Sequence, residues 1–352
     1  MPLLTTETGR FRDSYVAESR INDTPSKRVV VLGGLLLLFL VVPLVADDYQ
    51  LGVLNLIGIA AVGALGLNLL VGFTGQISLG HAAFAAVGAY TAANLAMRLE
   101  LPALIAIPAA GLMAGAVSLL FGVAALRVKG LYLAIATLAA QYSIEWVLNH
   151  WSFATGGYQA TLLMPPFSIG PWDSSTTIGK YFLIMGILAI GVVYAENLFR
   201  SRTGRALVAV RDQYLAAEGV GINVFHYKLR AFFISSVYAG IAGALYGYNV
   251  GIVTTEFFPL VLSIQFLAMI IIGGLGSIPG SILGAAFVTL IPIVLRDGLP
   301  SLGIAFSSDI EVYLVQVLFG LTILLFLVLE SGGLYRLFNN IRDYFRMWPF
   351  SY

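Results

Sequence analysis

The sequence has 352 residues, of which 59% are hydrophobic and only 11% are charged, with a mean hydropathy of +0.90 and a net charge of +1. Soluble domains carry about 25% charged residues, so this composition excludes an ordinary water-soluble protein and indicates a chain whose solvent is lipid. The near-neutral charge gives no reason to expect a nucleic-acid partner. The chain has no cysteine, which excludes disulfides and thiolate metal sites, and His81, His150 and His226 are too scattered to predict a metal site.

The predicted elements begin after a polar segment. Residues 1–28 lack a small-residue cleavage site, so we expect a retained cytoplasmic tail and not a signal peptide. Residues 29–330 form a series of apolar segments, each close to the roughly 20 residues that a helix needs to cross a bilayer. The ten predicted spans are 29–46, 52–71, 77–97, 102–125, 131–149, 180–197, 230–250, 259–273, 279–296 and 312–330. The predicted fold class is an all-α polytopic membrane protein with about ten transmembrane helices, and a cytoplasmic tail over 331–352.

Three of these spans touch glycine-rich breaks, and we expect some of them to be broken or re-entrant. They are 77–97, 259–273 and 279–296. Irregular backbone at membrane depth is tolerated only where it is buried in protein or lines a cavity. The breaks therefore indicate places where the protein uses unusual backbone.

Lysine and arginine predict the orientation of the chain, because they gather in short cytoplasmic loops. Ten crossings with a cytoplasmic N-terminus leave only Arg98, Lys180 and Arg296, of the 19 basic residues, on the outer side. The predicted cytoplasmic segments are 1–28, 72–76, 126–130, 198–229, 274–278 and 331–352. We therefore expect a multi-pass protein of the cytoplasmic membrane with both termini inside.

The first break lies in "LLVGFTGQISLGHAAFAAVGAYTAANL" (69–95), where glycines and small polar groups interrupt an apolar run. We predict that it borders a translocation path. Weak, neutral hydrogen-bond partners suit a path that must also release its substrate. The predicted path residues are Asn68, Thr74, Gln76, Ser78 and His81. For His81 a second role is favoured, that of a buried histidine bonded to a neighbouring backbone carbonyl.

The second break lies in "IIIGGLGSIPGSILGAAFVTLIP" (270–292) and is loosely similar to the first. Glycine-interrupted segments in corresponding positions of two halves are typical of a transporter binding site near the membrane midplane. Close helix packing through small residues is the alternative explanation, and both can hold together.

The inner loop 198–229 contains a predicted helix from Arg205 to Glu218. Gly204 precedes this helix, and Gly219 and Gly221 end it. A short helix between two spans is either a docking surface for a partner or an interfacial helix that lies on lipid.

The chain contains neither a phosphate-binding Gly-x-x-x-x-Gly-Lys-Ser/Thr loop nor clustered catalytic groups, so we expect neither an enzyme nor a bound cofactor. A stand-alone carrier coupled to an ion gradient usually keeps a deep acidic residue, and Glu145 is the clearest acid within the spans. That single acid makes a secondary carrier the weaker alternative. The sequence favours a translocation path whose energy comes from a separate ATPase docked on the inner loop.

Three ordered blocks carry a family resemblance. "GFTGQISLGHAAFAAVGAYTAANL", "GRALVAVRDQYLAAEGVGINVFHYKLRAFFISSVYAGIAGALYG" (204–247) and "IIGGLGSIPGSILGAAFVTLIP" resemble the LivM-type permease subunits of ABC importers for branched-chain amino acids. The resemblance covers roughly residues 50–330. It leaves the cargo open, because permeases for urea, short amides or other amino acids look alike.

The resemblance implies an assembly of four kinds of subunit in membrane lipid. This chain would pair with a LivH-like permease, two cytoplasmic ATPases would bind beneath and hydrolyse the ATP, and an external binding protein would deliver the solute. The implied coupling residues are Arg211, Asp212, Ala216, Ala217, Glu218 and Gly221. The order of residues in "AAEGVGI" (216–222) differs from the usual Glu-Ala-Ala…Gly pattern, which leaves open which of them touch the ATPase.

Overall fold

The computed structural model describes residues 33–34, 37–125, 130–158, 160–169, 172–173 and 176–301, together with scattered residues between 314 and 340. The long helices are α4 (Asp48–Thr74), α5 (His81–Leu99), α6 (Ala103–Ala125), α7 (Leu131–His150), α9 (Thr177–Arg200), α12 (Val224–Val250), α13 (Leu260–Gly273) and α14 (Ile278–Ser301). The shorter elements are η1 (Leu37–Val41), α3 (Val42–Val45), α8 (Ser152–Thr155), α10 (Arg202–Asp212), α11 (Tyr214–Gly219) and η2 (Thr255–Phe257). The predicted all-α membrane fold is confirmed.

The predicted number of ten spans stays a prediction. In the described part of the chain, six helices are long and apolar enough to cross a membrane: α4, α6, α9, α12, α13 with the preceding turn, and α14. Helices α5 and α7 are also long, but they carry polar side chains such as His81, Asn94 and Gln141 along their length. The predicted span 312–330 falls mostly outside the described residues, and span 29–46 is described only in part.

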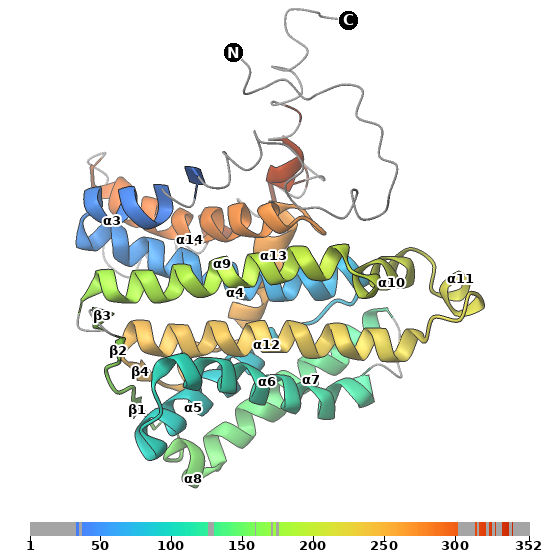
Figure 1. Cartoon of the computed structure of the whole chain (residues 1–352), viewed down its shortest axis with the longest axis horizontal. Helices are drawn as coiled ribbons and strands as arrows, with labels where there is room; N and C mark the ends of the chain where they lie inside the picture. Colours follow the sequence, from blue (N-terminus) through green and yellow to red (C-terminus); the bar gives the residue numbers. More distant parts are fainter. Residues whose placement is uncertain are drawn as a thin grey trace, which may run out of the picture.

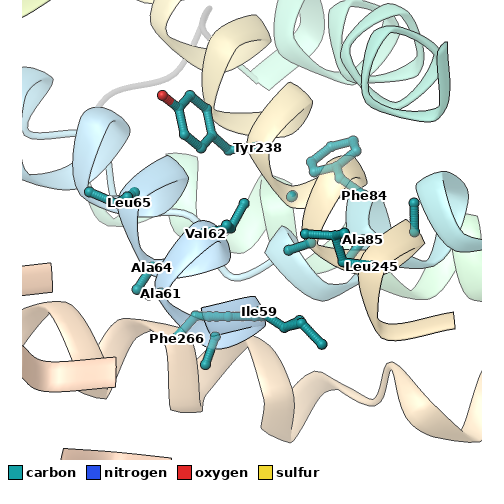
Figure 2. Packing of buried hydrophobic residues seen from close by; sticks show 14 of the residues in the cluster. Ile59, Ala61, Val62, Ala64, Leu65, Phe84, Ala85, Tyr238, Leu245 and Phe266 are labelled. Atoms are coloured by element: carbon teal, nitrogen blue, oxygen red, sulfur yellow. The ribbon is translucent and has the colours of Figure 1, made fainter. Parts of the chain in front are cut away.

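Helix α4 forms the centre of the bundle. Its 27 residues make a helix about 40 Å long, enough to cross the hydrocarbon core with residues to spare. The most apolar stretch of α4 is 83% buried inside the fold, whereas that of α9 is 28% buried and leaves most of its side chains for lipid. Helices α9, α10, α12, α13 and α14 all contact α4, and α5 meets it where His81 bonds to Gly63 O. Figure 2 shows side chains of α4 packed against Phe84, Tyr238, Leu245 and Phe266 of three neighbouring helices.

Glycine allows the central helices to approach closely, which is the alternative that the sequence left open. A Cβ at Gly88 of α5 would collide with the backbone of Gly240 in α12, and one at Gly243 would collide with the carbonyl of Ala85. In lipid, helices associate through such close contacts of small residues, because no hydrophobic effect drives them together. Glycines 273, 280 and 284 pack α13 against α14 in the same way.

The two ends of the bundle carry different structures (Figure 1). Helices α10 and α11 project at one end, which we call the α10 end. The opposite α3 end has four short strands, β1 (Leu162–Leu163) with β4 (Ile252–Val253), and β2 (Ser168–Ile169) with β3 (Trp172–Asp173). The sequence did not predict these strands. The pair β1–β4 joins the segment between α8 and α9 to the residues that follow α12, and the pair β2–β3 lies within that segment.

Candidate functional site

The first glycine break interrupts a helix, as predicted. Gly75 ends α4 with a left-handed φ of 68°, and α5 begins at His81. The ring atom Nε2 of His81 lies 2.9 Å from the carbonyl oxygen of Gly63, in the middle of α4. Residues 75–80 therefore turn back along α4, and α5 starts inside the fold. The backbone carbonyl expected as the partner of His81 is confirmed.

The buried start of α5 needs acceptors, because the first N–H groups of a helix have no partner within it and lipid offers none. Neighbouring helices supply them through three bonds: Leu79 N to Thr137 Oγ1 (2.9 Å), Ala82 N to Ser263 Oγ (2.8 Å) and Ala83 N to Gln141 Oε1 (2.9 Å). The sequence analysis missed Thr137, Gln141 and Ser263. A signal for them was present in the sequence. They are polar residues on apolar helices, and a helix that starts within the membrane needs such residues as hydrogen-bond acceptors.

The second break lies beside the first at the α10 end. Gly274 to Ser277 join α13 to α14, and Asn68 of α4 holds this turn. The side-chain amide of Asn68 donates to Ser277 O (2.9 Å) and to Ser281 Oγ (2.7 Å), and its Oδ1 accepts from Gly276 N (2.9 Å). A single buried side chain thus ties the second break to the helix that leads into the first.

The bonds of Asn68 predict a large loss of stability for Asn68→Ala. Removing three bonds and leaving their buried partners unpaired should cost about 2–4 kcal/mol. Asn55→Ala is the matched control, since Asn55 is equally buried but makes one longer bond, to Thr177 O at 3.4 Å. Thermal unfolding in detergent should show a clearly lower midpoint for the Asn68 variant, and equal midpoints for both would contradict this role.

The other predicted path residues also belong to this buried junction. Thr74, Gln76, Ser78 and His81 are each 3% exposed or less. Thr74 Oγ1 donates to Leu70 O (2.6 Å) and accepts from Gln76 Nε2 (2.7 Å), whereas Gln76 Oε1 has no hydrogen-bond partner among the described residues. The structure gives the four residues a place in the break, and their contact with substrate stays a prediction.

Two neighbouring cavities lie in the half of the bundle that is nearer the α3 end. The first, which we call the mouth, has a volume of about 550 Å³ and combines Asp48, Lys180 and Arg296 with polar groups such as Thr177 and Asn249. The second, the apolar cavity, has a volume of about 250 Å³. Its lining consists mainly of apolar and small residues: Leu56, Ile59, Ala60, Ala85, Ala242, Gly243, Tyr246, Phe257, Phe258, Leu262 and Phe266, with Gln265 and Thr289. Leu56 lines both cavities, so the two cavities are neighbours along α4.

The apolar cavity reaches the first break through one aromatic ring. Phe266, on its wall, lies edge-on against His81, with ring centroids 5.3 Å apart. A charged opening, an apolar chamber and a helix break therefore follow one another along α4. The sequence could not place Phe266 or Leu56, since neither differs from an ordinary core residue in its pattern.

At the α10 end, the predicted helix over Arg205 to Glu218 is wrong in its boundaries. Helix α10 runs from Arg202 to Asp212 and contains Gly204, and α11 runs from Tyr214 to Gly219. Gln213 separates them with an extended backbone, φ −154° and ψ 89°. The break lets α10 bury Leu207 and Val210 while α11 turns outward.

The implied coupling residues divide into two groups. Ala217 is 3% exposed and packs against Val210 and Val224, so it holds α11 in place. Asp212, Ala216, Glu218 and Gly221 are exposed. Leu215 and Val220, which the sequence analysis did not select as coupling residues, are 64% and 78% exposed beside them.

A family model described as "Branched-chain amino acid transport system / permease component" matches residues 49–327, which include both breaks, the apolar cavity, the mouth apart from Asp48, and the α10–α11 segment. The chain belongs to this permease family.

Three curated relatives show how far the similarity extends. The permease protein LivM of the high-affinity branched-chain amino acid transport system of Escherichia coli (strain K12) is 31% identical, over 79% of this chain and 71% of LivM. The permease protein LivH of the same system is 26% identical over 78% of this chain and 91% of LivH. The autoinducer 2 import system permease LsrC of Enterobacter sp. (strain 638) is 30% identical over 53% of each chain. No solved structure matches the permease.

The permease is therefore a multi-pass membrane protein whose described helices place the family's three sequence blocks at defined positions. The first block forms the break before α5, the second forms α10, α11 and α12, and the third joins α13 to α14. The three blocks meet around the α10 end of α4.

Proposed function

We propose that the permease is a transmembrane subunit of an ABC importer that carries leucine, isoleucine and valine across the cytoplasmic membrane. Its partners would be a LivH-like permease, two ATPases at the α10 end and an external binding protein at the α3 end. Both termini would then be cytoplasmic. The observation that carries the proposal is the charged mouth beside an apolar cavity, in a chain of this family.

The cavities suit the chemistry of a free aliphatic amino acid. Its carboxylate would find Lys180 and Arg296 in the mouth, and its ammonium group would find Asp48. Its branched side chain would leave water for the apolar cavity, which favours binding by roughly 25 cal/mol per Å² of apolar surface. The same apolar wall offers few hydrogen-bond partners to urea or short amides, so it disfavours that alternative cargo.

The predicted path residues would come next on the route of the substrate. A substrate in the apolar cavity lies against Phe266, and the ring of Phe266 lies against His81 at the start of α5. Movement of the first break would open a passage lined by Asn68, Thr74, Gln76 and Ser78. These neutral groups would pass a zwitterion on without holding it tightly.

Filling the apolar cavity should stop transport. Ala60→Phe places a ring in a cavity of about 250 Å³ and should lower leucine uptake by about tenfold or more, equivalent to about 1.4 kcal/mol of lost binding. The measurement is ATP-dependent uptake of labelled leucine by the reconstituted importer, with isoleucine, valine, urea and acetamide as competitors.

The matched control is Ala109→Phe on α6, a partly exposed alanine that lines neither cavity. Uptake by the Ala60 variant equal to that of the control would contradict the proposed cavity. Competition by urea instead of isoleucine and valine would contradict the proposed cargo, and uptake without ATP would contradict the importer class.

A further inference from the structure

The structure assigns a specific role to Arg211. Its guanidinium links the cytoplasmic helix α10 to both glycine breaks, and it transmits a movement of α10 to the backbone of these breaks. Arg211 is then a positioning residue that acts inside the permease, and its guanidinium does not dock on the ATPase. The inference rests on the proposed function in one respect only, that the ATPase is the source of the movement of α10.

The first contact of Arg211 is with the end of α4. Its Nη1 atom donates to the carbonyl oxygen of Gly72 at 2.6 Å, and its Cγ atom lies 3.3 Å from the point where a Cβ at Gly75 would stand. Gly72 and Gly75 belong to the last turn of α4 and its left-handed cap. The side chain of α10 thus holds the point at which α4 ends and the first break begins.

The second contact is with the other break. The same Nη1 atom lies 3.5 Å from the point where a Cβ at Gly276 would stand, and Gly276 has a left-handed φ of 76°. Gly276 N donates to Asn68 of α4. One guanidinium group therefore bonds to the first break and lies beside the second, and the separation of 208 residues between Asn68 and Gly276 shows how far apart the two segments are in sequence.

Arginine suits this position for two physical reasons. A cation at the C-terminal end of a helix is favoured by the helix dipole, and the last carbonyls of α4 need donors. The planar guanidinium also has five N–H donors in a fixed arrangement, which lets one side chain bond in several directions at once. Its Nε donates to Asp212 Oδ1 at 3.0 Å, and this ion pair at the surface orients the side chain from the solvent side.

The glycines make the contact responsive. At the first break the guanidinium bonds directly to the backbone carbonyl of Gly72, and at the second break Gly276 has no Cβ that would lie against it. A shift of α10 would therefore move the backbone of both breaks without rearranging a packed core. The middle of α14 and the start of α5, which follow these breaks, contribute Thr289 and Ala85 to the lining of the apolar cavity.

The first test compares Arg211→Gln with Arg200→Gln in the complete importer. Arg200 is a matched control, since its side chain is 37% exposed against 40% for Arg211, and its 3.6 Å ion pair is with Glu196, away from the breaks. We expect the Arg211 variant to retain its ATPase subunits on purification while leucine taken up per ATP hydrolysed falls by about tenfold, a change of about 1.4 kcal/mol. Arg211→Lys, which keeps one donor, should recover part of the loss.

The second test follows the cavity directly and does not depend on the cargo. The chain has no cysteine, so Thr289→Cys introduces a single thiol on the wall of the apolar cavity. We expect its rate of modification by a small aqueous thiol reagent to change when a non-hydrolysable ATP analogue is added, and Arg211→Gln to abolish this change.

Two outcomes would overturn the inference. One is an Arg211→Gln importer whose uptake per ATP matches that of Arg200→Gln, and the other is a nucleotide-dependent change in thiol modification that persists in the Arg211 variant. If leucine is not the cargo, the result would be distinguishable from these two outcomes. The importer without the Arg211 substitution would then take up no leucine, while the modification rate of the thiol would still change with nucleotide in a way that depends on Arg211.

Discussion

Gly72→Ala should abolish transport, although it adds a single methyl group. The Cβ would lie in collision with Asn68 Oδ1 and with the backbone nitrogen of Gly276, and 2.9 Å from the Cα of Gly276. The added methyl group would thus disrupt the hydrogen bond from Gly276 N to Asn68 Oδ1, which joins the second break to α4. Overpacking typically costs 1–3 kcal/mol, and the loss of a buried hydrogen bond adds about 1 kcal/mol. We therefore expect the free energy of unfolding to fall by about 3 kcal/mol or more. Leucine uptake should fall below about a tenth of that of the unmodified importer.

A second glycine separates this local effect from the general effect of adding a methyl group to a helix. Gly186 of α9 has open space around the position of its Cβ, so Gly186→Ala should stabilise the helix by up to about 1 kcal/mol. Thermal unfolding in detergent and leucine uptake would be measured for both variants. Normal uptake by Gly72→Ala would mean that the two breaks need not touch.

The double variant Leu215→Glu, Val220→Glu should separate the ATPase from the permease. Both side chains are exposed, 64% and 78%, at the tip of the α10–α11 segment, and that tip lies in solvent at one end of the bundle (Figure 1). Exposed apolar groups of this kind are typical of a protein interface. Two new charges in the centre of such an interface should cost at least about 2–3 kcal/mol of binding, which is a loss of about 30-fold or more in affinity.

Co-purification of the ATPase with the tagged permease is the measurement. The control is Leu104→Glu on α6, which changes a side chain of similar exposure, 56%, outside the α10–α11 segment. Ala217→Trp is a poor probe of docking, because Ala217 is buried against Val210 and Val224 and a larger side chain would displace α11 itself. Undiminished co-purification of the double variant would place the docking surface elsewhere.

The sequence predicted the parts of this fold that depend on local pattern. Apolar segments of bilayer length became helices, and the glycines at 72–80 and 274–276 became breaks because left-handed φ angles and close backbone contacts require glycine. The buried histidine with a carbonyl partner followed from the cost of an unpaired ring nitrogen in an apolar segment.

The sequence did not predict what depends on contacts between distant segments. Asn68 was selected as a polar residue near a break, but its bonds to residues 276–281 join α4 to α14 and leave no trace in the local pattern. The inner helix was predicted as one helix from Arg205 to Glu218 because Gln213 is a good helix former. In the structure it begins at Arg202 and is interrupted at Gln213, where Val210 and Ala217 pack on the start of α12. The cavities arise from four or more helices together, so single-segment patterns could not locate them.

The start of α5 also constrains the order in which the chain can be completed during synthesis. The N–H groups of Ala82 and Ala83 find their acceptors in Ser263 and Gln141, and Ser263 follows Ala82 by 181 residues. The start of α5 can therefore complete its backbone hydrogen bonds only after α13 has been synthesised and inserted into the membrane. Until then, N–H groups of the early helices lie unpaired in lipid, which offers no acceptors. In a nascent chain halted before residue 260, we expect α5 to be incompletely packed and accessible to proteases or chaperones. It should reach its final position only when α13 and α14 have been added.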